Sequence, residues 1–285
     1  MKYATFEYDG CKRVGSVETA AGRIHPLDVD TMIDIIDRPD LPTLDPRSGS
    51  VDLAEVRLLA PIPRPRRNIF CVGKNYREHA REFTKSGFDS SARSADETIP
   101  EVPIIFTKVP ESVMGSGAEI LYPVGVSAAL DYEAELAVVI GKGGRHISRS
   151  SAADCVWGYT IINDVTARDW QSRHKQWFLG KSFDTFCPMG PWLVTADEID
   201  TSNLSIRCWV NDELRQDANT GDLIFDVPTL IETISAGVTL YPGDVIATGT
   251  PKGVGLGFDP PRYLQSGDYV RISIDGLGTL VNRVG

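Results

Sequence analysis

The sequence contains no long apolar run. Nothing in its 285 residues approaches the roughly 18 consecutive apolar residues that a transmembrane helix needs. The chain starts Met-Lys-Tyr-Ala-Thr-Phe, and because no apolar segment follows the first lysine, we expect no secretory signal. These absences argue against a membrane partner.

Cysteine and positive charge are also in short supply. The five cysteines are odd in number, far apart and without a CxxC pair, which argues against a disulfide framework or a zinc knuckle and favours a reducing cytoplasm. A net charge of −10, from 29 Lys and Arg against 39 Asp and Glu, argues against nucleic acid or an anionic membrane as a partner. Because this field repels an anionic substrate, local cations such as a bound metal would have to capture it.

The overall composition, 42% hydrophobic and 24% charged, is that of an ordinary globular protein with one large domain or a large and a small one. Residues 1–60 are the candidate small domain, because two strand-like runs flank the hairpin signal Asp9-Gly10 and a short helix is expected at residues 30–36. A turn-rich connector and a proline-rich joint then precede the candidate catalytic domain, residues 66–285.

Short strand-like runs dominate the larger part, with helix candidates only at residues 75–83 and 229–237. The pattern predicts an α+β fold that is mostly β, with a mixed sheet, closed or rolled, and a small N-terminal α/β domain. The polar segment 84–100 is typical of either a mobile lid or disorder. The strand candidates are residues 69–72, 104–106, 135–140, 159–162, 206–210 and 270–274.

Acidic residues in two of these strand regions predict a metal site. Glu133 and Glu135 alternate along one strand and therefore project from the same face, although an isolated pair of this kind is more often solvated. The run 158–164 ends in Asp164, which alone would more often be a turn former or a cap. If the two strand ends meet, three carboxylates converge, and oxygen ligands suit Mg²⁺ or Mn²⁺ rather than zinc. About three coordination positions would stay open for a 2-oxo carboxylate and a water.

Two further elements carry groups suited to catalysis. On a helix, His79 and Glu82 are three residues apart and share a face, so the carboxylate can orient the imidazole as a base for water. Alone, such a pair is more often a surface ion pair. Lys181 lies among aromatic and small residues and could neutralise a substrate carboxylate or oxyanion, although a lysine stem can also cover apolar surface.

The glycine-rich stretch 247–257 is not a dinucleotide-binding fingerprint. That fingerprint opens a helix near the start of a βαβ unit, whereas here Phe258-Asp259-Pro260-Pro261 follows the glycines. A loop whose backbone N–H groups and Thr250 hydroxyl hold an anion is the better functional interpretation. A plain glycine turn is the alternative.

Together these motifs resemble the fumarylacetoacetate hydrolase family, and in particular its acylpyruvase-like bacterial members, over nearly the whole of residues 66–285. Each motif is weak alone, but six occur in the right order. They are Gly73 to Glu82, Pro103 to Lys108, Asp131 to Glu135, Asn163 to Asp169, Gly180 to Asp184 and Thr248 to Pro251.

The resemblance implies a mixed β-roll, a homodimer and a bound Mg²⁺ or Mn²⁺. The implied metal ligands are Glu133, Glu135 and Asp164. His79 and Glu82 would lie on a lid helix and activate water, and Lys181 would hold the carbonyl or enolate. Lys108, Arg168, Gln171 and Thr250 would line the substrate pocket. The first 60 residues and the segment 84–100 depart from the family pattern, and the second could select the substrate.

The motifs favour metal-dependent hydrolysis of a C–C bond in an acylpyruvate-type 2,4-dioxo acid, giving pyruvate (or a 2-oxo acid) and a carboxylic acid. Oxaloacetate decarboxylation, or isomerisation or decarboxylation of an unsaturated 2-hydroxy diacid, is the alternative on the same fold, because each passes through the same enolate. The third hypothesis is a metal-stabilised binding protein without turnover, which would need the three carboxylates but not His79, Glu82 or Lys181.

Overall fold

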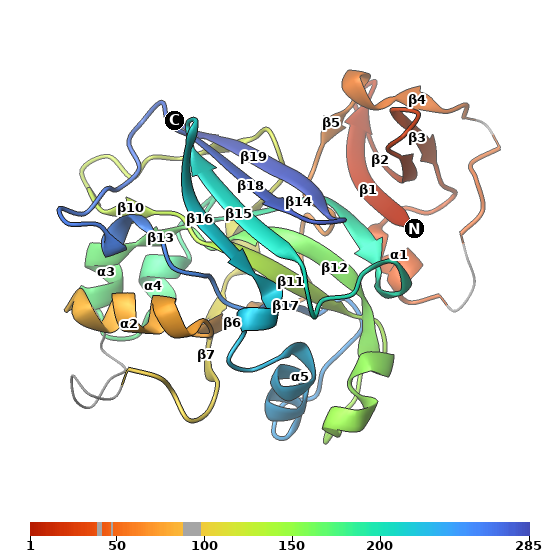
Figure 1. The fold of residues 1–285 in the computed structure, drawn as a ribbon. Coiled ribbons are helices and arrows are strands. Elements are labelled where there is room, and N and C mark those ends of the chain that lie inside the picture. Colours follow the sequence, from red (N-terminus) through yellow and green to blue (C-terminus); the bar gives the residue numbers. More distant parts are fainter. Residues whose placement is uncertain (39–41, 47, 88–97) are drawn as a thin grey trace.

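The computed structural model describes residues 1–38, 42–46, 48–87 and 98–285 (Figure 1). Most of the segment 84–100 falls in residues 88–97, outside the described residues, and so its two interpretations stay open. No helix in the described ranges has the length and apolar character needed to cross a bilayer.

Strands make up most of the regular structure. They are β1 (Lys2–Tyr8), β2 (Cys11–Glu18), β3 (Arg23–Pro26), β4 (Val51–Asp52), β5 (Arg57–Leu58), β6 (Ile69–Gly73), β7 (Ile104–Lys108), β8 (Val113–Met114), β9 (Glu119–Ile120), β10 (Leu130–Asp131), β11 (Ala134–Ile140), β12 (Val156–Asn163), β13 (Thr166–Ala167), β14 (Cys187–Thr195), β15 (Ser205–Val210), β16 (Glu213–Asn219), β17 (Val245–Ala247), β18 (Tyr269–Ile274) and β19 (Gly278–Val284). The helices are α1 (Met32–Ile36), α2 (Arg77–Lys85), α3 (Arg168–Arg173), α4 (Phe178–Lys181) and α5 (Val227–Ser235).

The main sheet runs in the order β4-β3-β2-β1-β14-β12-β11-β17-β6-β7 and combines antiparallel pairs with the parallel pair β17–β6. A second sheet, β16-β15-β18-β19-β9, packs against it (Figure 1). One apolar cluster joins the two, with Leu136 and Val138 from β11 and Ile206 and Ile272 from the second sheet. The expected α+β fold, mostly β with mixed sheets, is confirmed.

The hairpin predicted at Asp9-Gly10 is also confirmed. Tyr8 pairs with Cys11, and the two turn residues have φ angles of 50° and 72°, as a tight two-residue hairpin requires. β1 then joins the main sheet by pairing with β14. The proposed division between residues 1–60 and 66–285 stays a prediction.

Strand β11 lies in the buried centre of the protein and leads to the predicted acidic residues. All seven residues of β11 are buried, because alternate side chains enter different apolar clusters on its two faces. Its neighbours β12 and β17 extend this buried centre. Helices α2, α3 and α4 gather at the end of the molecule opposite the N-terminal strands, as Figure 1 shows. Polar side chains at that end of the buried strands are therefore enclosed.

Candidate active site

Three carboxylates meet where β11 begins and β12 ends. Glu135 lies on β11 and Glu133 directly precedes it, whereas Asp164 directly follows β12. These strands are antiparallel and pair Ala134 with Asn163, which brings the three carboxylates to one edge. One oxygen of each lies within 4.8 Å of the others, and all three residues are buried. The structure thus brings together the side chains that the sequence analysis assigned to a metal.

Backbone contacts hold this arrangement rigidly. The Glu133 N–H donates to Asn163 Oδ1 at 3.0 Å, and the Asp164 N–H donates to the Glu133 carbonyl at 2.9 Å. On the other side, the Gly249 N–H donates to Glu135 Oε2 at 2.9 Å. Because each carboxylate-bearing residue is tied to an adjacent strand or loop, the set is preorganised.

Buried cations surround the carboxylates. Lys181 Nζ lies 2.7 Å from Glu133 Oε2 and 2.8 Å from Asp164 Oδ2. Lys108 Nζ donates to the other Asp164 oxygen at 2.6 Å. Arg168 Nη2 lies 2.7 Å from Glu133 Oε1, as an ion pair whose N–H is not aligned as a hydrogen bond. The site is therefore a dense network of paired charges rather than a solvated acidic patch.

The charge balance of this network fits a hard divalent cation. Burial disfavours the charged form of Glu133, but Lys181 and Arg168 outweigh burial and lower the pKa of its carboxyl to about 2. Burial, followed by the charges of Asp164 and Glu133, raises the pKa of Glu135 well above its ordinary value. Like-charge repulsion therefore persists at Glu135. Three oxygen donors with such residual repulsion suit Mg²⁺ or Mn²⁺ better than zinc.

Helix α2 covers the pocket and carries the predicted His/Glu pair. His79 Nδ1 lies 3.2 Å from Glu82 Oε2, and the imidazole is buried. Phe83, on the same face, packs edge-on against Trp177. Glu78 instead points to the surface, where it pairs with Lys252.

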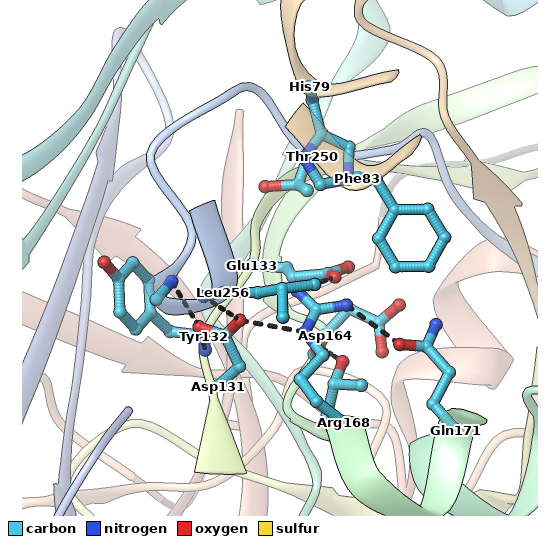
Figure 2. A network of polar contacts seen from close by, with 12 residues as sticks. His79, Phe83, Asp131, Tyr132, Glu133, Asp164, Arg168, Gln171, Thr250 and Leu256 are labelled. Atoms are coloured by element: carbon cyan, nitrogen blue, oxygen red, sulfur yellow. Dashed lines mark hydrogen bonds and ion pairs between the residues drawn. The ribbon is translucent and has the colours of Figure 1, made fainter. Parts of the chain in front are cut away.

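Most of the predicted site residues line one pocket. Figure 2 shows His79 and Phe83 of α2 on one side of the acidic cluster and Arg168 and Gln171 of α3 on the other. Three predicted residues lie behind the pocket wall: Asp164, Lys108, which faces Asp164, and Glu82, which supports His79. The predicted residues that line the pocket are His79, Glu133, Glu135, Arg168, Gln171, Lys181 and Thr250.

Several residues at the site were not singled out from the sequence. Lys74 lines the pocket directly after β6 and has a left-handed φ of 56°. Phe106 and Trp177 supply an aromatic wall. Asp131, completely buried, accepts a hydrogen bond from Arg168 Nε at 2.8 Å. Asp131 stands in the same acidic motif as Glu133, and this was the only sequence signal for it.

Comparisons with known proteins give a consistent relationship. The family model for the fumarylacetoacetate (FAA) hydrolase C-terminal domain matches residues 68–285. The chain is 53% identical to the oxaloacetate tautomerase YisK of Bacillus subtilis over 234 residues, covering 82% of this chain and 74% of the relative. It is 47% identical to the mitochondrial oxaloacetate tautomerase FAHD2A of Homo sapiens, covering 81% of this chain and 70% of the relative.

Solved structures are similar over the entire chain. A fumarylacetoacetate hydrolase from Exiguobacterium antarcticum has a TM-score of 0.86 at 42% identity, covering 100% of this chain and 99% of the other. A 2-hydroxyhepta-2,4-diene-1,7-dioate isomerase from Mycobacterium marinum has a TM-score of 0.81 at 35% identity, with 100% and 98% covered.

A third structure contains ligands. It is a maleylpyruvate hydrolase from Sphingobium sp. SYK-6 in complex with manganese(II) and pyruvate, with a TM-score of 0.78 at 31% identity and 100% and 98% of the two chains covered. With the family model matching more than half of the residues and relatives this similar, the chain belongs to the fumarylacetoacetate hydrolase family.

Proposed function

We propose that this protein is a divalent-metal-dependent enzyme that interconverts the keto and enol forms of a small 2-oxo diacid, with oxaloacetate as the first substrate to test. The observation that carries the proposal is that one pocket brings together the imidazole of His79, two of the three clustered carboxylates and buried cationic side chains. The two carboxylates are Glu133 and Glu135, and the cations are Lys181 and Arg168. The relatives at 53% and 47% identity, both named oxaloacetate tautomerases, support this choice of reaction.

Glu133, Glu135 and Asp164 would hold the metal, Mg²⁺ or Mn²⁺. When bound, such an ion polarises the 2-oxo group and lowers the free energy of the developing enolate. A manganese ion and pyruvate in the maleylpyruvate hydrolase structure support this assignment. Lys181 and Arg168 keep the Glu133 carboxyl ionised, and Lys181 and Lys108 hold the Asp164 carboxylate in place.

His79 is the proposed proton carrier. If the Glu82 carboxylate accepts a hydrogen bond from Nδ1–H, then Nε2 is the basic nitrogen of the imidazole. In the keto-to-enol direction, Nε2 takes a proton from C3 of the substrate and the same proton is returned to the C2 oxygen. No water is consumed and no bond between carbon atoms breaks.

The remaining predicted residues bind and orient the substrate in this proposal. Lys181 donates a hydrogen bond to the C2 oxygen as negative charge develops there. Arg168 and Gln171, joined by a 3.1 Å hydrogen bond, face a substrate carboxylate from α3. Thr250, whose hydroxyl accepts a hydrogen bond from Gln216 at 2.9 Å, completes the pocket wall. Lys108 acts through Asp164 rather than on the substrate.

This proposal replaces the C–C hydrolysis that the sequence analysis preferred. The more similar relatives favour the alternative based on the enolate, because tautomerases and isomerases need no attacking water. Hydrolysis is the second candidate, since the chain is 31% identical to a maleylpyruvate hydrolase and the His79–Glu82 pair could also activate water. A binding protein without turnover has no support among these relatives.

The test follows the ultraviolet absorbance of enol-oxaloacetate as it approaches equilibrium, with Mg²⁺ or Mn²⁺ and with excess chelator. We expect a metal-dependent acceleration that His79→Ala abolishes, without release of pyruvate. Parallel assays with acetylpyruvate and fumarylpyruvate measure hydrolysis. Fast pyruvate formation from these substrates, with no effect on oxaloacetate tautomerisation, would establish the hydrolase instead.

We also propose a homodimer in a reducing compartment. All five cysteines are free, as a reducing compartment requires.

Exposed apolar side chains at Leu121, Val124 and Val126 offer a surface that a second copy could cover. Light scattering after size-exclusion chromatography measures the oligomeric state directly, and a monomer mass at micromolar concentration would exclude the dimer.

A further inference from the structure

The loop Gly253–Gly257 donates backbone hydrogen bonds in two directions. Toward α2, the Gly253 N–H donates to the two oxygens of Glu82 at 3.1 and 3.3 Å. Toward the interior, the Gly255 N–H donates to Asp131 Oδ1 at 2.6 Å and the Leu256 N–H donates to Asp131 Oδ2 at 3.0 Å. One short segment thus holds a carboxylate of the lid helix and a carboxylate of the core.

The Glu82 carboxylate of α2 packs against the backbone of the loop. A Cβ added at Gly257 would lie 1.8 Å from Glu82 Oε1, so only glycine leaves room for the carboxylate in this position. Gly253 has a φ of +98°, and a Cβ there would lie 1.9 Å from the Arg215 carbonyl oxygen. The two glycines therefore shape a receptor for Glu82, which in turn contacts His79.

On its other side the loop reaches the substrate-binding arginine through Asp131. The Asp131 carboxylate, completely buried, accepts from Arg168 Nε at 2.8 Å in addition to the two loop N–H groups. Arg168 in turn donates to Gln171 and contacts Glu133. Figure 2 shows this chain of contacts from Leu256 through Asp131 and Arg168 to Gln171.

We propose that Asp131 and the loop Gly253–Gly257 form a positioning unit that couples the seating of α2 to the orientation of Arg168 and Gln171. The inference rests on the proposed function for the roles of His79 and Arg168. Asp131 holds the backbone N–H groups of Gly255 and Leu256 in place. Because these residues belong to the same short loop as Gly253, the Gly253 N–H is also held in position to bind Glu82. Loss of either carboxylate contact frees the loop and so disturbs the opposite side.

Hydrogen exchange of the whole chain, read by mass spectrometry, tests the coupling without any assay of activity. Asp131→Asn removes the charge that holds the loop N–H groups and Arg168, and we expect faster exchange in residues 77–85, the helix α2 that carries Glu82. Asp244→Asn is the matched control, because Asp244 is also a buried carboxylate that accepts from an arginine and from a backbone N–H, but outside the site. Unchanged exchange in α2 of Asp131→Asn would overturn the proposal.

Gly257→Ala tests the coupling in the reverse direction and covers the case in which Asp131→Asn does not fold. The added methyl group displaces Glu82, and we expect faster exchange in α3, residues 168–173. Gly237→Ala is the control, because a Cβ there meets nothing within 4 Å. Exchange in α3 equal to that of the wild type would contradict the coupling.

Kinetics then separate this inference from the proposed function. Each single variant should lower kcat about 10- to 100-fold with a smaller change in KM, because a small misplacement of reacting groups is costly. The double variant should lose little more than the worse single variant, since both act through one loop. Losses that multiply would refute the positioning unit even in an active tautomerase. A wild-type protein without tautomerase activity would refute the proposed function and leave the exchange result intact.

Discussion

Lys108 Nζ lies 2.6 Å from Asp164 Oδ1, and both side chains are completely buried. The ammonium also donates to the Val165 carbonyl at 3.1 Å, so it is committed to the end of β12 rather than to the pocket. Lys108 therefore fixes one carboxylate of the proposed metal site and offsets its charge. The family resemblance instead implied that Lys108 lines the substrate pocket.

Lys108→Met should destabilise the metal-free protein by about 3 kcal/mol, because it removes one of the two ammonium groups that pair with the buried Asp164 carboxylate and leaves only Lys181. Saturating Mg²⁺ should reduce the loss, since a bound divalent ion supplies the missing positive charge. Urea unfolding with a chelator and with saturating Mg²⁺ measures the free energy of unfolding of wild type and variant in each condition. Lys142→Met, at an exposed position, should stay within about 0.5 kcal/mol of the wild type. An equal loss with and without Mg²⁺ would argue against a metal at Asp164.

Removal of a proposed ligand should weaken metal binding. We expect Glu135→Gln to lower Mn²⁺ affinity at least about 10-fold, because even outer-shell substitutions commonly have effects of this size. Electron paramagnetic resonance of free Mn²⁺ gives the dissociation constant. The exposed Glu55→Gln is the control. Wild-type affinity in Glu135→Gln would remove Glu135 from the ligand set.

Helix α2 offers a matched pair of carboxylates for testing the proposed role of His79 as a base. Glu82→Gln should lower kcat for tautomerisation about 100-fold, since an amide orients and charges the imidazole less well than a carboxylate. Glu78 lies on the same helix as Glu82, but its carboxylate forms only an exposed ion pair with Lys252. The kcat of Glu78→Gln should therefore equal that of the wild type. Equal effects of the two substitutions would mean that the helix matters only as a cover.

Asp226 gives a prediction for stability against pH away from the site. It caps α5 through the Thr229 N–H, and hydrogen bonds from Arg149 lower its pKa from 3.8 to about 2. The folded state therefore favours the ionised form, and this stabilisation is present above pH 3.8 and is lost as the pH falls towards 2.

Asp226→Ala should cost about 1 kcal/mol at neutral pH, a modest value because the side chain is 47% exposed and solvent screens the pair. Urea unfolding at pH 7, 4 and 3 should show the difference from the wild type shrinking at the lowest pH. A difference that stays constant over this range would mean that ionisation of Asp226 contributes nothing to stability.

The sequence alone was sufficient for the local features. Asp9-Gly10 predicted the hairpin because the tight turn demands residues that tolerate positive φ. The spacing of His79 and Glu82 predicted their contact because residues three apart share a helix face. Glu133 and Glu135 were linked by strand alternation and Asp164 by the end of an apolar run. Each inference needed only the geometry of one element, or the resemblance of the ordered motifs to a known family.

The tertiary structure alone decided how charged residues of different elements are paired. The antiparallel register of β11 and β12 brought Asp164 to Glu133, and packing turned Lys108 toward Asp164. Asp131 meets the loop Gly253–Gly257 across more than 120 residues of sequence, and no local pattern encodes such a contact. Strand register and loop packing depend on the free energy of the whole core, whereas helix and turn geometry depend on neighbouring residues. The sequence therefore determined most of the reactive groups, and the fold added Lys74 and Asp131 and determined the pairing between elements.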